Sequence, residues 1–219
     1  MHILPIRWSV GKRLPRRYAK RFCVFAPENI FSYNRCMNRE IEVKISIGDS
    51  IEKAIEILSE KGIVLGGRVI QEDTVFCNYH GDYRVYEPGT IYMRLRKQNG
   101  EYIFTAKQPQ TTNLDCIEYE TKVENPEAIR GILELSGYHE VITIKKERRK
   151  AKHNSYEICL DNVEGLDVFV EVEAITDGVD SEKTLEELYV FAQTLGLDIK
   201  ERVMDGYDVL MWEKENGIS

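Results

Sequence analysis

The sequence predicts an α+β fold in which about eight β-strands close into one barrel flanked by helices. Three observations carry this prediction. Strands that alternate between polar and apolar residues recur along the chain, one strand–helix unit occurs twice, and the charges of successive strands fall on one face. A chain of 219 residues, with 42% hydrophobic and 31% charged residues, can also bury a core of this size and remain well solvated.

The first strand–helix unit begins at the regular alternation of residues 39–47. A helix is predicted after it, with Asp49 and Glu52 as a capping box and Gly62 at its end. Weaker strand patterns run through residues 63–76. Two further strands, 92–97 and 102–107, are joined across Asn-Gly, which is typical of a tight hairpin.

The second unit begins at the alternating residues 116–124. Its helix is predicted to start with Asn125 as N-cap and Pro126 in the first turn, and to end at Gly137. The rest of the chain is predicted to form strands near 141–149, 155–161 and 167–174, a helix over 181–196, and a short helix or strand over 207–215.

The two units form an internal repeat. Residues 40–44 read Glu-Ile-Glu-Val-Lys and residues 118–122 read Glu-Tyr-Glu-Thr-Lys, so the repeat is displaced by 118 − 40 = 78 residues. This period is too long for a solenoid. It fits two halves of a single closed sheet, related by a pseudo-twofold axis.

A charged face on one strand usually faces solvent. Here opposite charges recur on one face of strand after strand, while the other face is apolar and three amphipathic helices can cover it. The charged faces are therefore predicted to point into the barrel. They carry seven carboxylates and six cations: Glu40, Glu42, Glu118, Glu120, Asp161, Glu171 and Glu173, with Lys44, Arg94, Arg96, Lys107, Lys146 and Arg148.

Such a lumen is costly without a ligand that complements both charges. Paired carboxylates suit Mg²⁺ or Mn²⁺. Arginine and lysine suit phosphate oxygens. A metal ion together with a polyphosphate is therefore the predicted occupant. Within the basic run 145–152, only Lys146 and Arg148 are expected to contribute, the remainder being a solvated strand end.

Residues 1–38 are expected to lie outside the fold as a basic tail. The first 39 residues hold nine basic residues and one acid, a net charge of +8, so the remainder must carry −15 to reach the total of −7. The tail fits a flexible basic arm, a targeting peptide, or a stretch absent from the mature protein, with Met37 as the true start. The last interpretation is favoured.

The five cysteines are odd in number, widely spaced and lack a C-x-x-C pair. This pattern argues against a disulfide scaffold or a thiolate zinc site and favours a reducing, cytoplasmic setting. No apolar run is long enough for a membrane span, and no motif indicates a specific nucleic-acid partner.

The E-x-E-x-K strand at residues 40–44 resembles the signature of the CYTH superfamily, also called triphosphate tunnel metalloenzymes. The match continues in order through Tyr-Met-Arg-Leu-Arg (92–96), Phe-Thr-Ala-Lys (104–107), Glu-Tyr-Glu (118–120), Lys-Glu-Arg (146–148), Leu-Asp-Asn-Val-Glu-Gly (160–165) and Val-Glu-Val-Glu (170–173). It implies an eight-stranded antiparallel tunnel with flanking helices over residues 39–215. Two features depart from the family: Gly206-Tyr207 where Ser-Tyr is usual, and the N-terminal tail.

By this resemblance the chain looks most like the class IV adenylyl cyclases, which convert ATP to cyclic AMP and pyrophosphate. The alternatives are a triphosphatase acting on inorganic, thiamine or nucleoside triphosphate, and a non-catalytic module that binds polyphosphate or nucleotide. The chain is expected to act as a monomer or homodimer.

The resemblance also implies roles for the site residues. Glu40, Glu42, Glu171 and Glu173 would hold Mg²⁺ or Mn²⁺, with Glu118, Glu120 and Asp161 as further ligands. Triphosphate binding and catalysis would fall to Lys44, Arg94, Arg96, Lys107, Lys146 and Arg148.

Overall fold

The structure is a computed structural model that describes residues 39–80, 82, 89–176 and 180–218. The predicted basic tail, residues 1–38, lies outside the described residues. In chain order the elements are β1 (Arg39–Ile47), α1 (Ile51–Glu60), β2 (Val69–Cys77), β3 (Tyr92–Gln98), β4 (Glu101–Pro109), β5 (Asp115–Val123), α2 (Pro126–Leu135), β6 (His139–His153), β7 (Tyr156–Val163), β8 (Val168–Thr176), α3 (Ser181–Gln193), β9 (Ile199–Val203) and α4 (Tyr207–Glu215).

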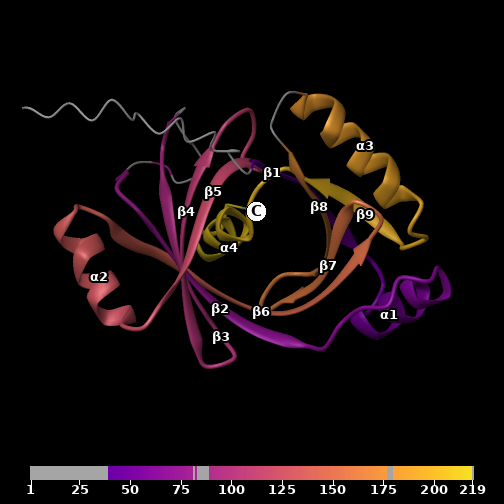
Figure 1. The fold of residues 1–219 in the computed structure, drawn as a ribbon, viewed down its shortest axis with the longest axis horizontal. Helices are drawn as coiled ribbons and strands as arrows, with labels where there is room; N and C mark the ends of the chain where they lie inside the picture. The colour runs from indigo at the N-terminus through magenta and orange to yellow at the C-terminus, as the bar shows by residue number, and fades with distance from the viewer. Residues whose placement is uncertain (1–38, 81, 83–88, 177–179, 219) are drawn as a thin grey trace, which may run out of the picture. The chain divides into compact units, whose positions relative to one another are not determined.

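Eight strands close into an antiparallel barrel (Figure 1). Neighbours follow the order β5-β4-β3-β2-β6-β7-β8-β1, and pairing between β1 and β5 completes the ring. This closing contact is short, running from Arg39 opposite Ile117 to Ile41 opposite Asp115. The predicted eight-stranded barrel is therefore confirmed.

A ninth strand, β9, was not predicted. It pairs with the second half of β1, between Lys44 opposite Val203 and Ile47 opposite Ile199. That half of β1 has a free edge because the closing contact with β5 uses only its first residues. The β9 sequence, Ile-Lys-Glu-Arg-Val, has too little alternation to be recognised as a strand.

The repeated strand–helix units are β1–α1 and β5–α2, and both helices follow their strands as predicted. Asn125 caps α2 as expected. The predicted capping box at α1 is wrong, because Ser50 is the N-cap. Asp49 instead accepts a hydrogen bond from the backbone N–H of Asp198, at 2.6 Å, and so connects this turn to the segment before β9.

The outward faces of the strands are apolar and lie under helices. Beneath α1 and α3, the largest core joins outward side chains of β1, β7 and β8, including Ile41, Val43, Ile45, Ile158, Leu160, Val170 and Val172. On another side Leu133 of α2 packs on Phe76 and Leu95. Since helices cover the apolar side, the charged side of these strands faces inward.

The helix α4, which the sequence left as helix or strand, lies within the ring of strands in Figure 1. Its residues Tyr207, Val209 and Met211 pack against Val75 and Phe169, two inward side chains at one end of the barrel. An apolar cluster thus fills that end, and the charged residues occupy the remaining interior. None of the described helices is long and apolar enough to cross a bilayer.

Candidate active site inside the barrel

A cavity of about 950 Å³ occupies the barrel interior. It is lined by twelve of the thirteen site residues that the sequence predicted, namely Glu40, Glu42, Lys44, Arg94, Arg96, Lys107, Glu118, Glu120, Lys146, Arg148, Glu171 and Glu173. The thirteenth, Asp161, is fully buried and accepts hydrogen bonds from two of the lining cations, Lys146 and Arg148. The charged faces therefore point into the barrel, as predicted.

Strand register explains this convergence. Residues directly opposite one another in neighbouring strands share a face of the sheet. The opposed pairs include Glu42 with Glu173, Lys44 with Glu171, Lys107 with Glu118, and Arg148 with Asp161. A slip of one residue in any pair would turn a whole charged row outward.

The most deeply buried ion pairs surround Arg148. Its Nε donates to Oδ1 of Asp161 at 2.7 Å, and its Nη2 donates to Glu171. Lys146 Nζ lies 3.2 Å from Asp161, and Lys44 Nζ lies 3.3 Å from Glu171. Burial, the largest single influence, raises the pKa of each carboxyl, but the charges of Arg148 and the neighbouring lysines together outweigh it, so both pKa values lie below their ordinary range.

A second group of ion pairs lies on β3, β4 and β5. Lys107 Nζ is 2.6 Å from one oxygen of Glu118, and Arg94 Nη2 is 3.2 Å from the other. Burial, the largest single influence, lowers the pKa values of Lys107 and Arg94, but the charges of Glu118 and other nearby carboxylates together outweigh it, so both pKa values are raised and both side chains stay protonated. The side chain of Glu120 is 46% exposed, with one oxygen 3.6 Å from Arg94.

Arg96 has a carboxylate partner that the sequence analysis missed. Asp73 on β2 lies directly opposite it and accepts two hydrogen bonds, at 2.6 and 2.7 Å. Both residues are buried. The available signal was the alternation of Gln71, Asp73 and Val75, but polar residues on the other face of β2, such as Glu72, masked it.

Three further carboxylates gather with fewer or longer contacts to cations: Lys44 Nζ donates to Glu42 at 3.2 Å, and Arg148 Nη1 lies 3.7 Å from Glu173. Glu40, Glu42 and Glu173 each offer an oxygen within 4.8 Å of the others. The charge of Lys107 lowers the pKa of Glu40, but burial and three neighbouring carboxylates outweigh it and raise the value to about 8. Burial also raises the pKa of Glu173. A hard divalent cation bound by these oxygens would relieve the repulsion.

The predicted metal ligands therefore fall into different surroundings. Glu40, Glu42 and Glu173 form the cluster just described, which we call the acidic triad. Glu171, Asp161 and Glu118 are instead held by lysine and arginine. As placed here, these three orient the cations that face the cavity.

The sequence analysis also missed cavity residues near the C-terminal end of β6 and on α4. Lys150 and Lys152 continue the alternation of Lys146 and Arg148 and line the cavity, so the expectation that only two residues of this run contribute is too narrow. At the other end the Tyr207 ring lies 4.4 Å from Lys44 Nζ and 4.7 Å from Lys146 Nζ. Contact with the aromatic face favours the charged form of both lysines. For Lys146, burial and the charge of Arg148 outweigh this contact and lower its pKa.

Comparison with known proteins agrees with the fold. A protein of Methanocaldococcus jannaschii described as a putative adenylate cyclase is 30% identical over 171 residues, covering 77% of this chain and 95% of that protein. The PH1819 protein of Pyrococcus horikoshii has a TM-score of 0.63 at 23% identity, over 80% of this chain and 99% of that one.

A third relative is a putative adenylyl cyclase from Hippeastrum, described as having a dominant triphosphatase activity. Its structure has a TM-score of 0.53 at 16% identity and covers 82% of this chain and 96% of that one. The family model of the CYTH domain matches residues 38–207. Because this match spans most of the chain and the barrel carries the inward charges, the chain belongs to the CYTH domain family.

Proposed function

We propose that this protein is a divalent-metal-dependent enzyme that acts on a triphosphate bound inside the barrel. The observation that carries the proposal is the pairing of two opposite features in one cavity. The six predicted cationic side chains, together with Lys150 and Lys152, face the space that also contains the acidic triad. A triphosphate with its metal ion complements both features, whereas an uncharged ligand would complement neither.

The cations are arranged to bind phosphate oxygens. Asp73 holds Arg96 as a bidentate fork, and Asp161 orients Arg148 and Lys146 in the same way from behind. Buried partners of this kind fix the direction of each N–H donor before the substrate arrives. The remaining cations, Lys44, Arg94 and Lys107, complete the set.

Glu40, Glu42 and Glu173 are the residues that would hold Mg²⁺ or Mn²⁺, because they offer hard oxygen donors in a crowded acidic group. When bound, such an ion neutralises charge on phosphate oxygens and on the oxygen that attacks or leaves. The carboxylates of the other group, including Glu171 and Asp161, remain with their cations and keep them in position.

Among triphosphate reactions we place adenylyl cyclase chemistry first. A cavity of about 950 Å³ lies at the upper end of the usual range for small-molecule sites and leaves room for a nucleoside beyond the triphosphate. The relative from M. jannaschii is also described as a putative adenylate cyclase. In this reaction the ribose 3′-oxygen attacks the α-phosphorus, and pyrophosphate leaves.

The alternative is a triphosphatase, in which water attacks the γ-phosphorus within the same set of cations. The fold supports it equally, since the Hippeastrum neighbour is described with that activity. A module that only binds polyphosphate is the third candidate. The complete set of buried carboxylates and cations favours turnover, because simple binding does not require the acidic triad.

The deciding experiment incubates the full chain with Mg²⁺ or Mn²⁺ and, in parallel, ATP, thiamine triphosphate or tripolyphosphate, and separates the products. Cyclic AMP with pyrophosphate supports the cyclase. Orthophosphate release supports the triphosphatase. Absence of turnover with every substrate and metal contradicts an enzymatic function.

A matched pair of variants ties any activity to the cavity. Lys146 and Lys145 are neighbours on β6, but Lys146 is buried and lines the cavity, whereas the Lys145 side chain is 56% exposed beside Glu72. Lys146→Ala should lower activity strongly, while Lys145→Ala should leave it unchanged.

A further inference from the structure

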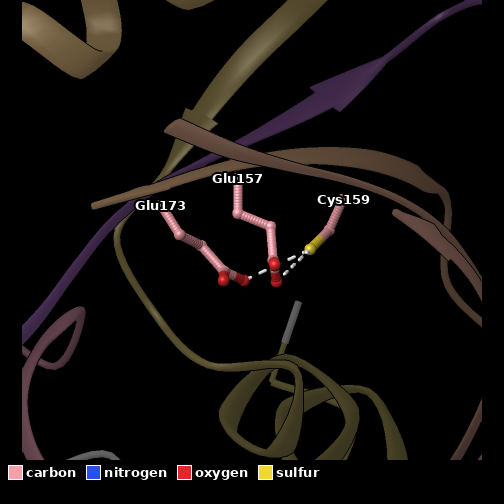
Figure 2. A group of neighbouring side chains, drawn as sticks. All are labelled: Glu157, Cys159 and Glu173. Atoms are coloured by element: carbon pink, nitrogen blue, oxygen red, sulfur yellow. Dashed lines mark hydrogen bonds between the residues drawn. The ribbon is translucent and has the colours of Figure 1, made fainter. Parts of the chain in front are cut away.

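A second group of potential metal ligands adjoins the acidic triad and includes a thiol (Figure 2). Glu157 and Cys159 lie on β7 and Glu173 on β8, and each offers one ligand atom within 4.8 Å of the others. Cys159 Sγ is 3.3 Å from Glu173 Oε1 and 3.9 Å from Glu157 Oε1. In Figure 2 the three side chains converge on one point.

Strand geometry makes this arrangement a built feature of the barrel. Glu157 lies directly opposite Glu173, and Cys159 follows two residues along β7 on the same inward face. Cys159 is fully buried, while Glu157 and Glu173 line the cavity. The ligand atoms are thus held on two packed strands and lie beside the lumen.

The donor set differs in kind from the acidic triad. Three carboxylates suit Mg²⁺ or Mn²⁺, but a thiolate is a soft ligand that these ions bind poorly. Two carboxylates and one thiolate leave a coordination position open for water, as three protein ligands do at zinc sites. We propose that Glu157, Cys159 and Glu173 form a second cation site in the barrel, which selects a thiophilic divalent cation such as Zn²⁺ over Mg²⁺.

The charges around this site allow a cation to enter. Lys150 forms an ion pair with Glu157, but its side chain is 46% exposed and can move into solvent when a cation replaces it. Arg148 Nη1 is 3.7 Å from Glu173 but retains its hydrogen bonds to Asp161 and Glu171. On binding, the Cys159 sulfur exchanges its proton for the metal, and the proton is released to solvent.

Glu173 belongs to both the acidic triad and the thiol-containing site. A thiophilic ion bound at the second site would therefore occupy a ligand that the triad needs for Mg²⁺. We expect Zn²⁺ to inhibit the Mg²⁺-dependent reaction. This consequence, unlike the site itself, rests on the proposed function.

The test uses Co²⁺ as a spectroscopic substitute for Zn²⁺, added to the reduced full chain without substrate. A cobalt–thiolate bond gives a charge-transfer band in the near ultraviolet, which added Zn²⁺ should abolish and a large excess of Mg²⁺ should not. We expect this band in the unsubstituted protein and its loss in Cys159→Ser. Cys116→Ser is the matched control, because Cys116 lines the same cavity but lies beside Tyr92, 3.8 Å from its hydroxyl.

Two further variants test the remaining contacts without removing the thiol. Glu157→Gln should keep the band but raise the Co²⁺ dissociation constant about 10-fold or more, because losing a direct ligand should cost at least as much as losing a group that supports one. Lys150→Ala should lower that constant several-fold, because it removes the competing cation. Near-ultraviolet circular dichroism shows whether each variant is folded.

No band in the folded unsubstituted protein overturns the proposal, as does a band that survives Cys159→Ser or an affinity that Glu157→Gln leaves unchanged. Because this measurement needs no turnover, its failure leaves the triphosphate function standing. Failure of the activity assays likewise leaves the cation site standing.

Discussion

Two groups of carboxylates share the cavity and differ in their partners. Asp161, Glu171 and Glu118 each contact two cations, and the pKa of each is lowered. Glu40 and Glu173 stand in the acidic triad, where the pKa of each is raised. Buried carboxylates thus have opposite pKa shifts in the two groups. The neighbouring charges decide whether such a carboxylate stabilises the fold or needs a ligand.

The largest effect should come from removing a paired carboxylate. Asp161→Asn leaves Arg148 and Lys146 buried without their main counter-charge, which should cost about 3–5 kcal/mol in the free energy of unfolding. Chemical denaturation measures this loss. Glu120→Gln is the control, because its side chain is 46% exposed and should change stability by less than about 1 kcal/mol. Equal losses in the two variants would remove the distinction between paired and exposed carboxylates.

Removing a member of the acidic triad should leave stability intact and weaken metal binding instead. Glu40→Gln relieves repulsion among buried carboxylates, so the metal-free protein should be at least as stable as before. Affinity for Mg²⁺ should fall about 10–100-fold, as measured by calorimetry, and raised Mn²⁺ should partly restore activity. Marked destabilisation with unchanged metal affinity would place Glu40 with the paired group instead.

Removing a cationic side chain should weaken binding of the triphosphate and leave binding of the metal ion unchanged. Lys107→Ala removes a charged donor beside Glu118, and the Michaelis constant for the triphosphate should rise about 10-fold, since such hydrogen bonds contribute about 1.5–3 kcal/mol. Raised Mn²⁺ should not restore it. Lys122→Ala serves as the comparison, because Lys122 is exposed and pairs with Glu101. Rescue of Lys107→Ala by metal alone would argue against this role.

The smallest expected effect is the change in stability per pH unit. The pKa of Glu40 is raised from 4.5 to about 8, so the folded state binds this proton more tightly than the unfolded state. The metal-free protein should therefore lose stability, by up to about 1.4 kcal/mol per pH unit, as the pH rises through that window. Thermal unfolding in a chelator at pH 5 and pH 8 measures the slope. Glu40→Gln should flatten it, and an unchanged slope would contradict the assignment. The paired carboxylates, whose pKa values are lowered, stabilise the folded state at neutral pH and lose this contribution only when the pH falls below the ordinary carboxyl range.

Local pattern was sufficient wherever one face of an element is uniform. The charged rows of β1, β3, β5 and β8 alternate with apolar residues, so their inward orientation followed once helices were available for the other side. At β2 the pattern indicated the strand but did not single out Asp73 as a site residue, because both faces are polar. It missed β9, which is too short. It also misplaced the N-cap of α1, because Asp49 had a distant partner in Asp198.

Period-two alternation assigns each side chain to a face, so it was enough to predict the eight-stranded barrel, its repeated units and twelve of the residues that line the cavity. Which charges meet could be known only from the folded chain. Register places Lys44 opposite Glu171 and Glu157 opposite Glu173, and barrel closure brings β1 against β5. Pairing of β1 with the distant strand β8 brought Glu40 and Glu42 to Glu173 and Lys44 to Glu171, while pairing of β7 with the next strand, β8, placed Cys159 beside the acidic triad. Electrostatic interaction depends on these distances in space and not on sequence spacing.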